Sequence, residues 1–186
     1  MIIMINGAFG AGKTSAANML QPLIPNSMIY DPEEIGFMIR KIVLEDIRLE
    51  EERTDDFQDI ELWRILTVRA AQEIKQKYNK NLIVPMTIYK SENFDYIYNG
   101  FKKLDEDTFH FCLIASEETI HKRLECRGDT YGGWTYQQTM KCINAFREIK
   151  FQEHIITDQI GTKEIIEIIL NKINKDNKNS VGKSMK

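Results

Sequence analysis

Short apolar runs alternate with longer amphipathic stretches along the chain, which is the pattern of a parallel sheet covered by helices on both faces. Residues 1–5 (MIIMI) are continuously apolar, as buried parallel strands are. Four more strands are predicted at 27–30, 82–88, 109–115 and 155–157. The predicted helices are 15–20, 33–50, 57–78, 93–103, 117–127, 136–150 and 162–174.

The length of 186 residues fits a single domain, which we expect to span residues 1–174. Residues 175–186 are polar and rich in lysine, a composition that predicts a disordered tail. A basic arm for a membrane or a nucleic acid is the alternative. The lysines are spread among asparagines, however, and this favours a solvated end.

The composition narrows the range of partners and compartments. A net charge of −3 argues against a nucleic-acid partner, because nucleic-acid binders usually carry a basic face. Three cysteines without a C-x-x-C pair indicate reduced thiols and a cytoplasmic protein. No basic and apolar leader opens the sequence, and no apolar run is long enough to span a bilayer, so we expect neither a signal peptide nor a transmembrane segment. Peripheral membrane contact and a homodimer stay open.

The strongest motif follows the first strand. Residues 7–14 (GAFGAGKT) fit the phosphate-loop pattern G-x-x-x-x-G-K-[ST] at every fixed position, between a predicted strand and a predicted helix. The glycines let successive N–H groups turn toward one anion, and the helix N-terminus adds partial positive charge. We expect ATP and Mg²⁺ here, with Lys13 on the β- and γ-phosphates and Thr14 on the metal. The predicted nucleotide-binding residues are Gly7, Ala8, Phe9, Gly10, Ala11, Gly12, Lys13, Thr14 and Ser15.

A phosphate loop also needs an acidic side chain, and Asp31 ends the second predicted strand. Ligands bind at the carboxyl ends of parallel strands, so Asp31 is the candidate general base toward a substrate hydroxyl or a ligand of Mg²⁺. A helix N-cap ahead of Pro32 is the structural alternative, and the two roles are compatible.

Arg123 and Arg127 lie four residues apart on one helix face, directly before a glycine-containing loop. This arrangement suits a lid, at about 127–135, that closes over phosphates and supplies catalytic charge. Compensation of the helix dipole is the simpler alternative.

A substrate pocket is expected in the helical region after Asp31 and at the end of the third strand. Its candidate residues are Arg40, Trp63, Arg64 and Thr87, although the helical periodicity of Trp63 also fits a core position. The histidines lack metal-ligand spacing, and no G-x-S-x-G elbow for a serine hydrolase occurs.

Several short segments within residues 1–160 form a combination that is more specific than the phosphate loop alone. They are 5–14 (INGAFGAGKT), 30–33 (YDPE), 62–64 (LWR), 83–88 (IVPMTI), 110–111, 115–116, 118–119, 122–124 and 154–155. Together they resemble the tunicamycin resistance protein family of small kinase-like proteins.

The resemblance implies a P-loop three-layer α/β fold with a five-stranded parallel sheet in the order 2-3-1-4-5 and a mobile lid. It also implies ATP binding and, by likeness to phosphotransferases of this fold, a base at Asp31. The expected activity is ATP-dependent phosphorylation of a hydroxyl on a small molecule such as a tunicamycin-like nucleoside antibiotic. The alternatives are an ATP-dependent protein that binds the antibiotic without turnover, and a kinase of a nucleotide or sugar.

Overall fold

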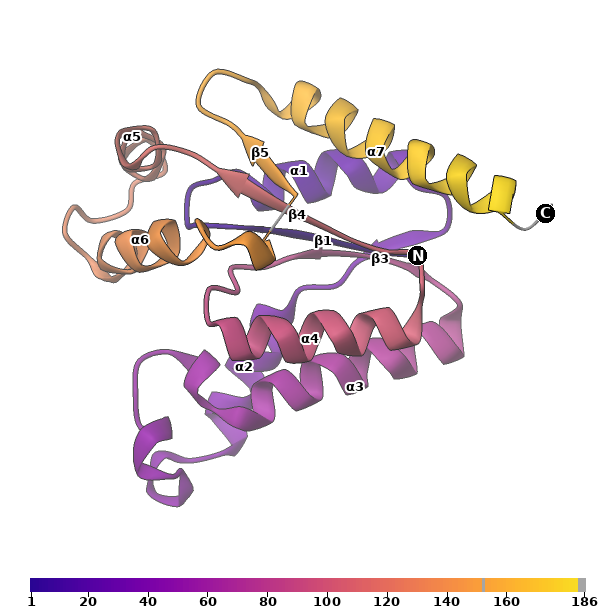
Figure 1. The fold of residues 1–186 in the computed structure, drawn as a ribbon. Helices are drawn as coiled ribbons and strands as arrows, with labels where there is room; N and C mark the ends of the chain where they lie inside the picture. The colour runs from indigo at the N-terminus through magenta and orange to yellow at the C-terminus, as the bar shows by residue number, and fades with distance from the viewer. Residues whose placement is uncertain (152, 184–186) are drawn as a thin grey trace.

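A five-stranded parallel sheet forms the centre of the computed structural model, which describes residues 1–151 and 153–183 (Figure 1). The strand order β2-β3-β1-β4-β5 confirms the predicted topology. The parallel pairing brings the carboxyl ends of all strands to one edge. The strands are β1 (Ile2–Gly7), β2 (Ser27–Ile29), β3 (Asn81–Pro85), β4 (Thr108–Ile114) and β5 (His154–Ile156).

The side chains of β1 alternate between two apolar cores, one on each face of the sheet. Ile3 and Ile5 pack with residues of α1 (Lys13–Leu20) and α7 (Thr162–Lys183). Ile2 and Met4 pack on the opposite face with residues of the remaining helices. Figure 1 shows α1 and α7 on one side of the sheet and α3 and α4 on the other, which gives the three predicted layers. The remaining helices are α2 (Pro32–Ile42), α3 (Glu61–Tyr78), α4 (Ser91–Leu104), α5 (Glu117–Cys126) and α6 (Trp134–Ala145).

The segment between α2 and α3 differs from the prediction. The expected helix 33–50 ends at Ile42, where the Arg48 guanidinium donates to the carbonyls of Val43 at 2.9 Å and Arg40 at 3.2 Å. These bonds satisfy carbonyl groups that the end of a helix leaves without partners. Three short 3₁₀ turns follow, at Glu45–Ile47, Glu50–Glu52 and Phe57–Asp59, and this purple segment projects at the lower left of Figure 1.

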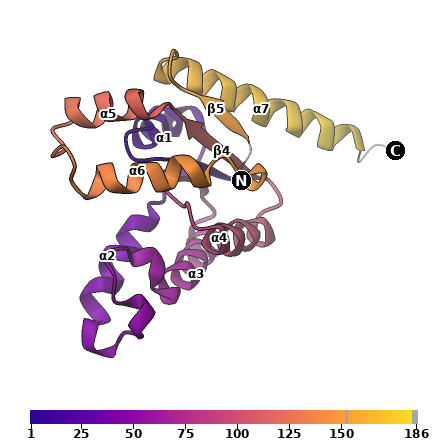
Figure 2. The same ribbon diagram turned by 60° about the vertical axis from the view of Figure 1, so that its left-hand side comes forward.

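The C-terminal helix is longer than predicted. α7 continues to Lys183, which corrects the expected helix end at residue 174, whereas disorder of the tail stays a prediction; residues 184–186 lie outside the described part of the chain. Buried isoleucines anchor the first half of α7 against α1, and a nucleated helix extends at little further cost. Figure 2 shows α7 running past the sheet. Within the described residues, no helix is both long and apolar enough to cross a bilayer.

We predict that Gly36→Ala destabilises the fold, although alanine favours helices by about 1 kcal/mol relative to glycine. A Cβ at Gly36 would lie 2.6 Å from Cγ of Phe57, an atom close to the backbone that cannot move away easily. Overpacking of this kind costs about 1–3 kcal/mol. Urea denaturation should show a loss of free energy of unfolding, whereas the exposed α2 variant Lys41→Ala should change it little. Stabilisation by Gly36→Ala would contradict the predicted clash.

Candidate active site

The phosphate loop runs from β1 to α1 at the carboxyl edge of the sheet, as predicted. Gly7 has φ +148°, and a Cβ there would lie 2.7 Å from the carbonyl oxygen of Leu113 on β4. Gly12 caps α1 with φ +100° and no side-chain hydrogen bond, so the first N–H groups of the helix have no side-chain cap. Such a helix N-terminus is a binding site for phosphate.

Lys13 is buried inside this loop. Its ammonium group donates to the carbonyl of Ala8 at 2.8 Å, and its side chain is buried. Burial lowers the pKa of Lys13, while the carboxylate of Glu33 raises it. The loop therefore contains a buried cation, which an anionic ligand would stabilise.

Asn6 connects the base of the phosphate loop to the strand beside it. Its side chain donates to the carbonyl of Ile88 at 3.0 Å and accepts from the N–H of the same residue at 2.9 Å. The same oxygen accepts from the N–H of Gly7 at 2.9 Å. Because Asn6 is buried, these bonds fix the loop relative to the segment after β3.

Two carboxylates follow β2. Asp31 caps α2 by accepting from the N–H of Glu33 at 2.9 Å, so the structural alternative for Asp31 is confirmed, and its role as a base stays a prediction. Burial raises the pKa of Asp31. Burial also raises the pKa of Glu33, as does repulsion from Asp31, whereas Lys13 lowers it. Asp31 thus caps the helix, whereas the carboxylate of Glu33 interacts with the charge of Lys13.

A cavity of about 770 Å³ lies over the phosphate loop. It collects most of the predicted nucleotide residues together with Asp31, Arg123 and Arg127. Gly7 and Ala8 do not line this cavity, because Gly7 packs against β4 and Ala8 belongs to the apolar core. The lining residues are Phe9, Gly10, Ala11, Gly12, Lys13, Thr14, Ser15, Asp31, Glu33, Pro85, Arg123, Arg127, Thr135, Ile160, Gly161, Thr162 and Ile165.

The two predicted lid arginines are held in different ways. Arg123 donates to the hydroxyl of Thr157 at 3.1 Å and to its carbonyl at 2.6 Å, which fixes it on the cavity wall. Arg127 follows α5, is 57% exposed and forms two bonds to Asp129, at 2.7 and 3.0 Å. The loop Gly128–Gly133 then leads into α6. Arg123 is therefore a fixed wall residue, whereas Arg127 belongs to the exposed loop.

A second cavity of about 330 Å³ adjoins the first, because Phe9 and Glu33 line both. Its wall is mostly apolar and aromatic and contains two of the predicted substrate residues, Arg40 and Thr87. The lining residues are Phe9, Glu33, Phe37, Arg40, Asp55, Asp56, Phe57, Gln58, Met86, Thr87 and Trp134.

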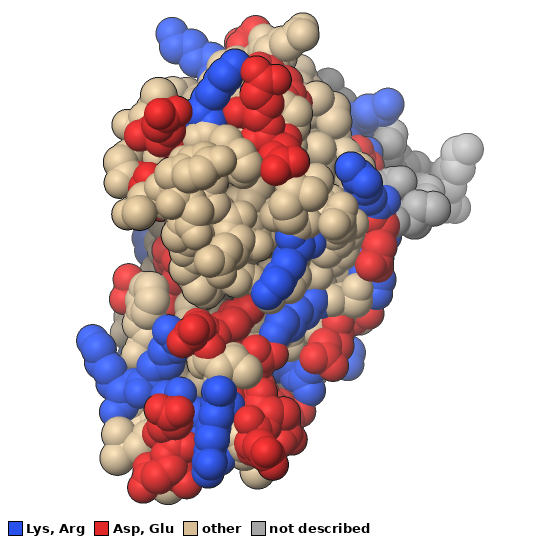
Figure 3. Space-filling model, turned by 90° about the vertical axis from the view of Figure 1, so that its left-hand side faces the viewer, with Lys and Arg blue, Asp and Glu red and all other residues tan. Residues whose placement is uncertain are grey.

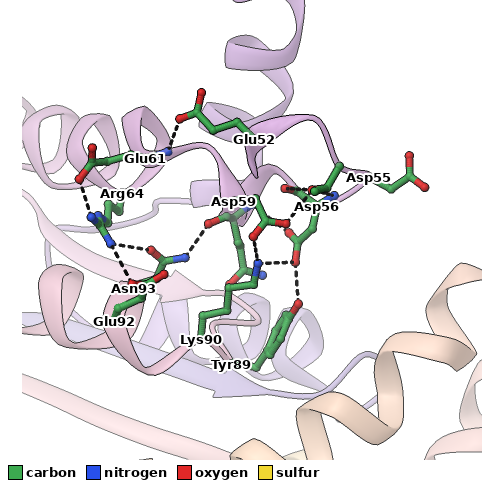
Figure 4. A network of polar contacts seen from close by, with 12 residues as sticks. Glu52, Asp55, Asp56, Asp59, Glu61, Arg64, Tyr89, Lys90, Glu92 and Asn93 are labelled. Carbon is green, nitrogen blue, oxygen red and sulfur yellow. Dashed lines mark hydrogen bonds and ion pairs between the residues drawn. The ribbon is translucent and has the colours of Figure 1, made fainter. Parts of the chain in front are cut away.

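Trp63 and Arg64 line neither of these cavities, so the structure does not bring them to the predicted substrate site. Trp63 is fully buried, and its indole N–H donates to the carbonyl of Pro32 at 3.0 Å. Arg64 contacts Glu61 and Asn93 along α3 and α4 (Figure 4). The sequence predicted a helix start at residue 57, but α3 begins at Glu61. Phe57 and Gln58 therefore lie in a 3₁₀ turn that lines the cavity.

A polar network supports the wall of the second cavity (Figure 4). Asp56 accepts from the Tyr89 hydroxyl at 2.8 Å, and Lys90 bonds to Asp59 and lies 3.8 Å from Asp56. Gln58 donates from its amide to the carbonyl of Thr87 at 3.1 Å. These contacts join the turn Phe57–Asp59 to the segment after β3 and so keep the wall in place.

The residues around the loop fit a nucleotide with Mg²⁺. Thr14 and Asp31 line the same cavity as Lys13, and hydroxyl and carboxylate oxygens are ligands that Mg²⁺ prefers. No cluster of three or more metal-ligating side chains occurs among the described residues. Mg²⁺ at nucleotide sites is commonly held by one or two side-chain oxygens together with phosphate oxygens.

The sequence reasoning missed Glu33, Phe37, Phe57, Gln58 and Trp134. Glu33 could have been predicted from the sequence. It lies two residues after Asp31, in the first turn of α2, and this turn lies at the carboxyl edge of the sheet where ligands bind. The others come from separate elements that only the folded chain brings together. Trp134 meets Phe9 edge to face, with ring centroids 5.3 Å apart.

Comparisons with known proteins agree with this fold and site. A family model described as an AAA domain matches residues 3–160. The solved tunicamycin resistance protein of Deinococcus radiodurans is 30% identical, with a TM-score of 0.73, and the match covers 92% of this chain and 94% of that one. No curated protein matches the sequence.

Two kinases share the fold at lower identity. A gluconokinase from Sinorhizobium meliloti is 18% identical with a TM-score of 0.66, over 98% of this chain and 96% of that one. A shikimate kinase from Acinetobacter baumannii is 16% identical with a TM-score of 0.59, over 94% and 93%. The phosphate loop at the carboxyl edge and the strand order agree with these matches. The chain therefore belongs to the AAA-domain P-loop proteins and, among them, to the kinase-like tunicamycin resistance protein family.

Proposed function

We propose that the protein transfers the γ-phosphoryl group of ATP to a hydroxyl of a small molecule, a nucleoside antibiotic of the tunicamycin type. The observation that carries the proposal is the pair of joined cavities, one over the phosphate loop and one with an apolar wall. Phe9 and Glu33 form their common boundary, so two ligands could meet there. The relationship to a tunicamycin resistance protein supports the choice of substrate.

The side chains supply positioning and positive charge, which are the main requirements of phosphoryl transfer. Lys13 would hold the β- and γ-phosphates, and Arg123 and Arg127, which line the same cavity, would neutralise further charge. Thr14 would hold a Mg²⁺ ion, which supplies further positive charge to the phosphate oxygens. Asp31 orients the acceptor hydroxyl and takes its proton.

The test is the formation of a phosphorylated product. Protein, ATP, Mg²⁺ and tunicamycin should give a product heavier by one phosphoryl group, detected by mass spectrometry. Lys13→Ala should abolish this product and weaken ATP binding about 10- to 100-fold, because a hydrogen bond from a charged donor is lost. Lys122→Ala, an exposed lysine on α5, is the matched control and should leave both unchanged.

The alternatives give different results in the same assay. Binding of tunicamycin that requires ATP but yields no product would favour the sequestering protein. ADP release with a nucleotide or a sugar, but not with tunicamycin, would favour a metabolite kinase. Unchanged ATP affinity in Lys13→Ala, measured by calorimetry, would refute the assignment of the loop itself.

We expect Asp31→Asn to lower kcat about 10²- to 10⁴-fold because the general base is lost. Its melting temperature should change little, since asparagine caps helices about as well as aspartate. Glu33→Gln should instead raise the KM of the acceptor more than it lowers kcat. Near-normal turnover in a stable Asp31→Asn protein, with turnover lost in Glu33→Gln, would assign the base to Glu33.

Arg127→Ala should lower kcat about 10³-fold with a small change in the KM of ATP, because its charge acts mainly in the transition state. The exposed α3 variant Arg69→Ala is the matched control. Proteolysis within Gly128–Gly133 should slow when ATP and acceptor are both bound. Equal protection of free and bound protein would show that this loop is not a lid.

A further inference from the structure

We propose that the smaller cavity selects an uncharged acceptor that carries a planar ring and N–H or O–H donors, as an uncharged nucleoside does, and rejects acceptors that carry a carboxylate or a phosphate. The inference deepens the proposed phosphotransferase function and rests on it. Three independent features of the cavity support it: its rings, its charge and its hydrogen-bonding groups.

Two edge-to-face aromatic pairs form much of the wall. Phe9 and Trp134 meet with ring centroids 5.3 Å apart at 71°, and Phe37 and Phe57 meet at 5.9 Å and 78°. Phe37 is 45% exposed and Trp134 is 41% exposed, so both retain free ring surface. Partly exposed aromatic rings at a cavity offer stacking surfaces for a planar ring. The volume of about 330 Å³ lies within the usual range for small-molecule sites.

The charged side chains that line the cavity are mostly acidic. Glu33, Asp55 and Asp56 line the cavity together with one guanidinium, that of Arg40. Glu33 interacts with the charge of Lys13, and Asp56 accepts from Tyr89 and lies 3.8 Å from Lys90. The carboxylate of Asp55 points away from this network in Figure 4, so it is the acidic group of the wall with the least compensation.

The segment that contributes Asp55 and Asp56 to the cavity has a net negative charge. Residues 43–60 carry eight acidic and two basic side chains. Figure 3 shows acidic and basic side chains side by side over the lower part of the face that presents this segment. The net negative charge of the segment disfavours the approach of anions.

Arg40 is the cationic side chain among the lining residues, so it could attract an anionic acceptor to the cavity. Its guanidinium donates to the backbone carbonyl of Asp55 and lies 5.8 Å from the ring centroid of Phe57. These contacts use it to hold the turn beside the cavity. An Arg40 variant is therefore part of the test.

Two buried residues of the wall give its hydrogen-bonding preference. The Gln58 amide nitrogen must face the carbonyl of Thr87, because a carbonyl can only accept, and this leaves Gln58 Oε1 as an acceptor. Within the described residues, neither Gln58 Oε1 nor Thr87 Oγ1 has a hydrogen-bond partner. Gln58 is 5% exposed and Thr87 is 1% exposed. Gln58 Oε1 favours an occupant that brings a donor, and the Thr87 hydroxyl can donate to or accept from the same occupant.

The experiment measures binding, separately from phosphoryl transfer. Calorimetry with the non-hydrolysable analogue AMPPNP and Mg²⁺ compares uridine with uridine 3′-monophosphate, which keeps the 5′-hydroxyl, and glucose with gluconate. Uridine should bind at least about 10-fold more tightly than its 3′-monophosphate, and gluconate should not bind better than glucose. Tunicamycin is a third uncharged probe. Binding without any phosphorylated product would leave this inference standing and refute the proposed function.

Variants identify the responsible groups. Thr87→Val should weaken uridine binding about 3- to 10-fold without loss of thermal stability, because it removes a buried hydroxyl that has no protein partner. Thr67→Val is the matched control: Thr67 is also buried with an unpartnered hydroxyl, but it lies on α3 outside the cavity, so uridine binding should not change. Asp55→Asn should reduce the ratio of the affinities for uridine and its 3′-monophosphate about threefold.

Opposite results overturn the inference. Equal or tighter binding of uridine 3′-monophosphate, together with its loss in Arg40→Gln, would show that the cavity takes anions through Arg40. Equal effects of Thr87→Val and Thr67→Val would remove Thr87 from recognition. Absence of binding by all uncharged probes, while AMPPNP binds, would also refute the assignment.

Discussion

The hydrogen bonds between Asn6 and Ile88 are the interaction on which the rest of the site depends. Asn6 is the penultimate residue of β1, directly before the phosphate loop, and Ile88 follows Thr87, a wall residue of the smaller cavity. The backbone groups of Ile88 lie beyond the end of β3, where the sheet no longer provides partners. The buried amide of Asn6 both donates and accepts, and so it replaces those partners. It thereby fixes the phosphate loop relative to the wall of the smaller cavity.

The two carboxylates at the start of α2, those of Asp31 and Glu33, have different contacts. Asp31 uses its carboxylate to cap α2, which fixes its position before any ligand binds. Glu33 lies two residues later, faces both cavities and is drawn toward Lys13 by charge. Pro32 between them is buried and starts the helix, so the spacing of the two carboxylates is set by the backbone. The backbone of this turn is therefore positioned before any ligand binds.

The sequence was sufficient where local patterns decide the structure. The phosphate loop, the strand that precedes it and the cap at Asp31 depend on residues close together in the chain, and all three were predicted. The strand order came from resemblance, because parallel crossovers leave no local signal. Trp63 and Arg64 were assigned to the substrate site because they lie in the helical region after Asp31, in a helix that was expected to begin at residue 57. Its start at Glu61 places Phe57 and Gln58 at the cavity and Trp63 in the core. Arg48, which ends α2 through backbone carbonyls, acts through a contact that periodicity cannot reveal.

The ring of Phe9 has a consequence for the two ligands together. Phe9 belongs to the phosphate loop, contacts Trp134 at the start of α6 and lines both cavities. A nucleotide that fixes this ring prepares a wall of the neighbouring cavity, and an acceptor that fixes it prepares a wall for the nucleotide. Thermodynamic linkage requires the two effects to be equal, so whatever factor the nucleotide adds to the affinity of the acceptor, the acceptor adds to that of the nucleotide. If both ligands contact this ring, one aromatic side chain would make the occupancies of the two cavities cooperative in both directions.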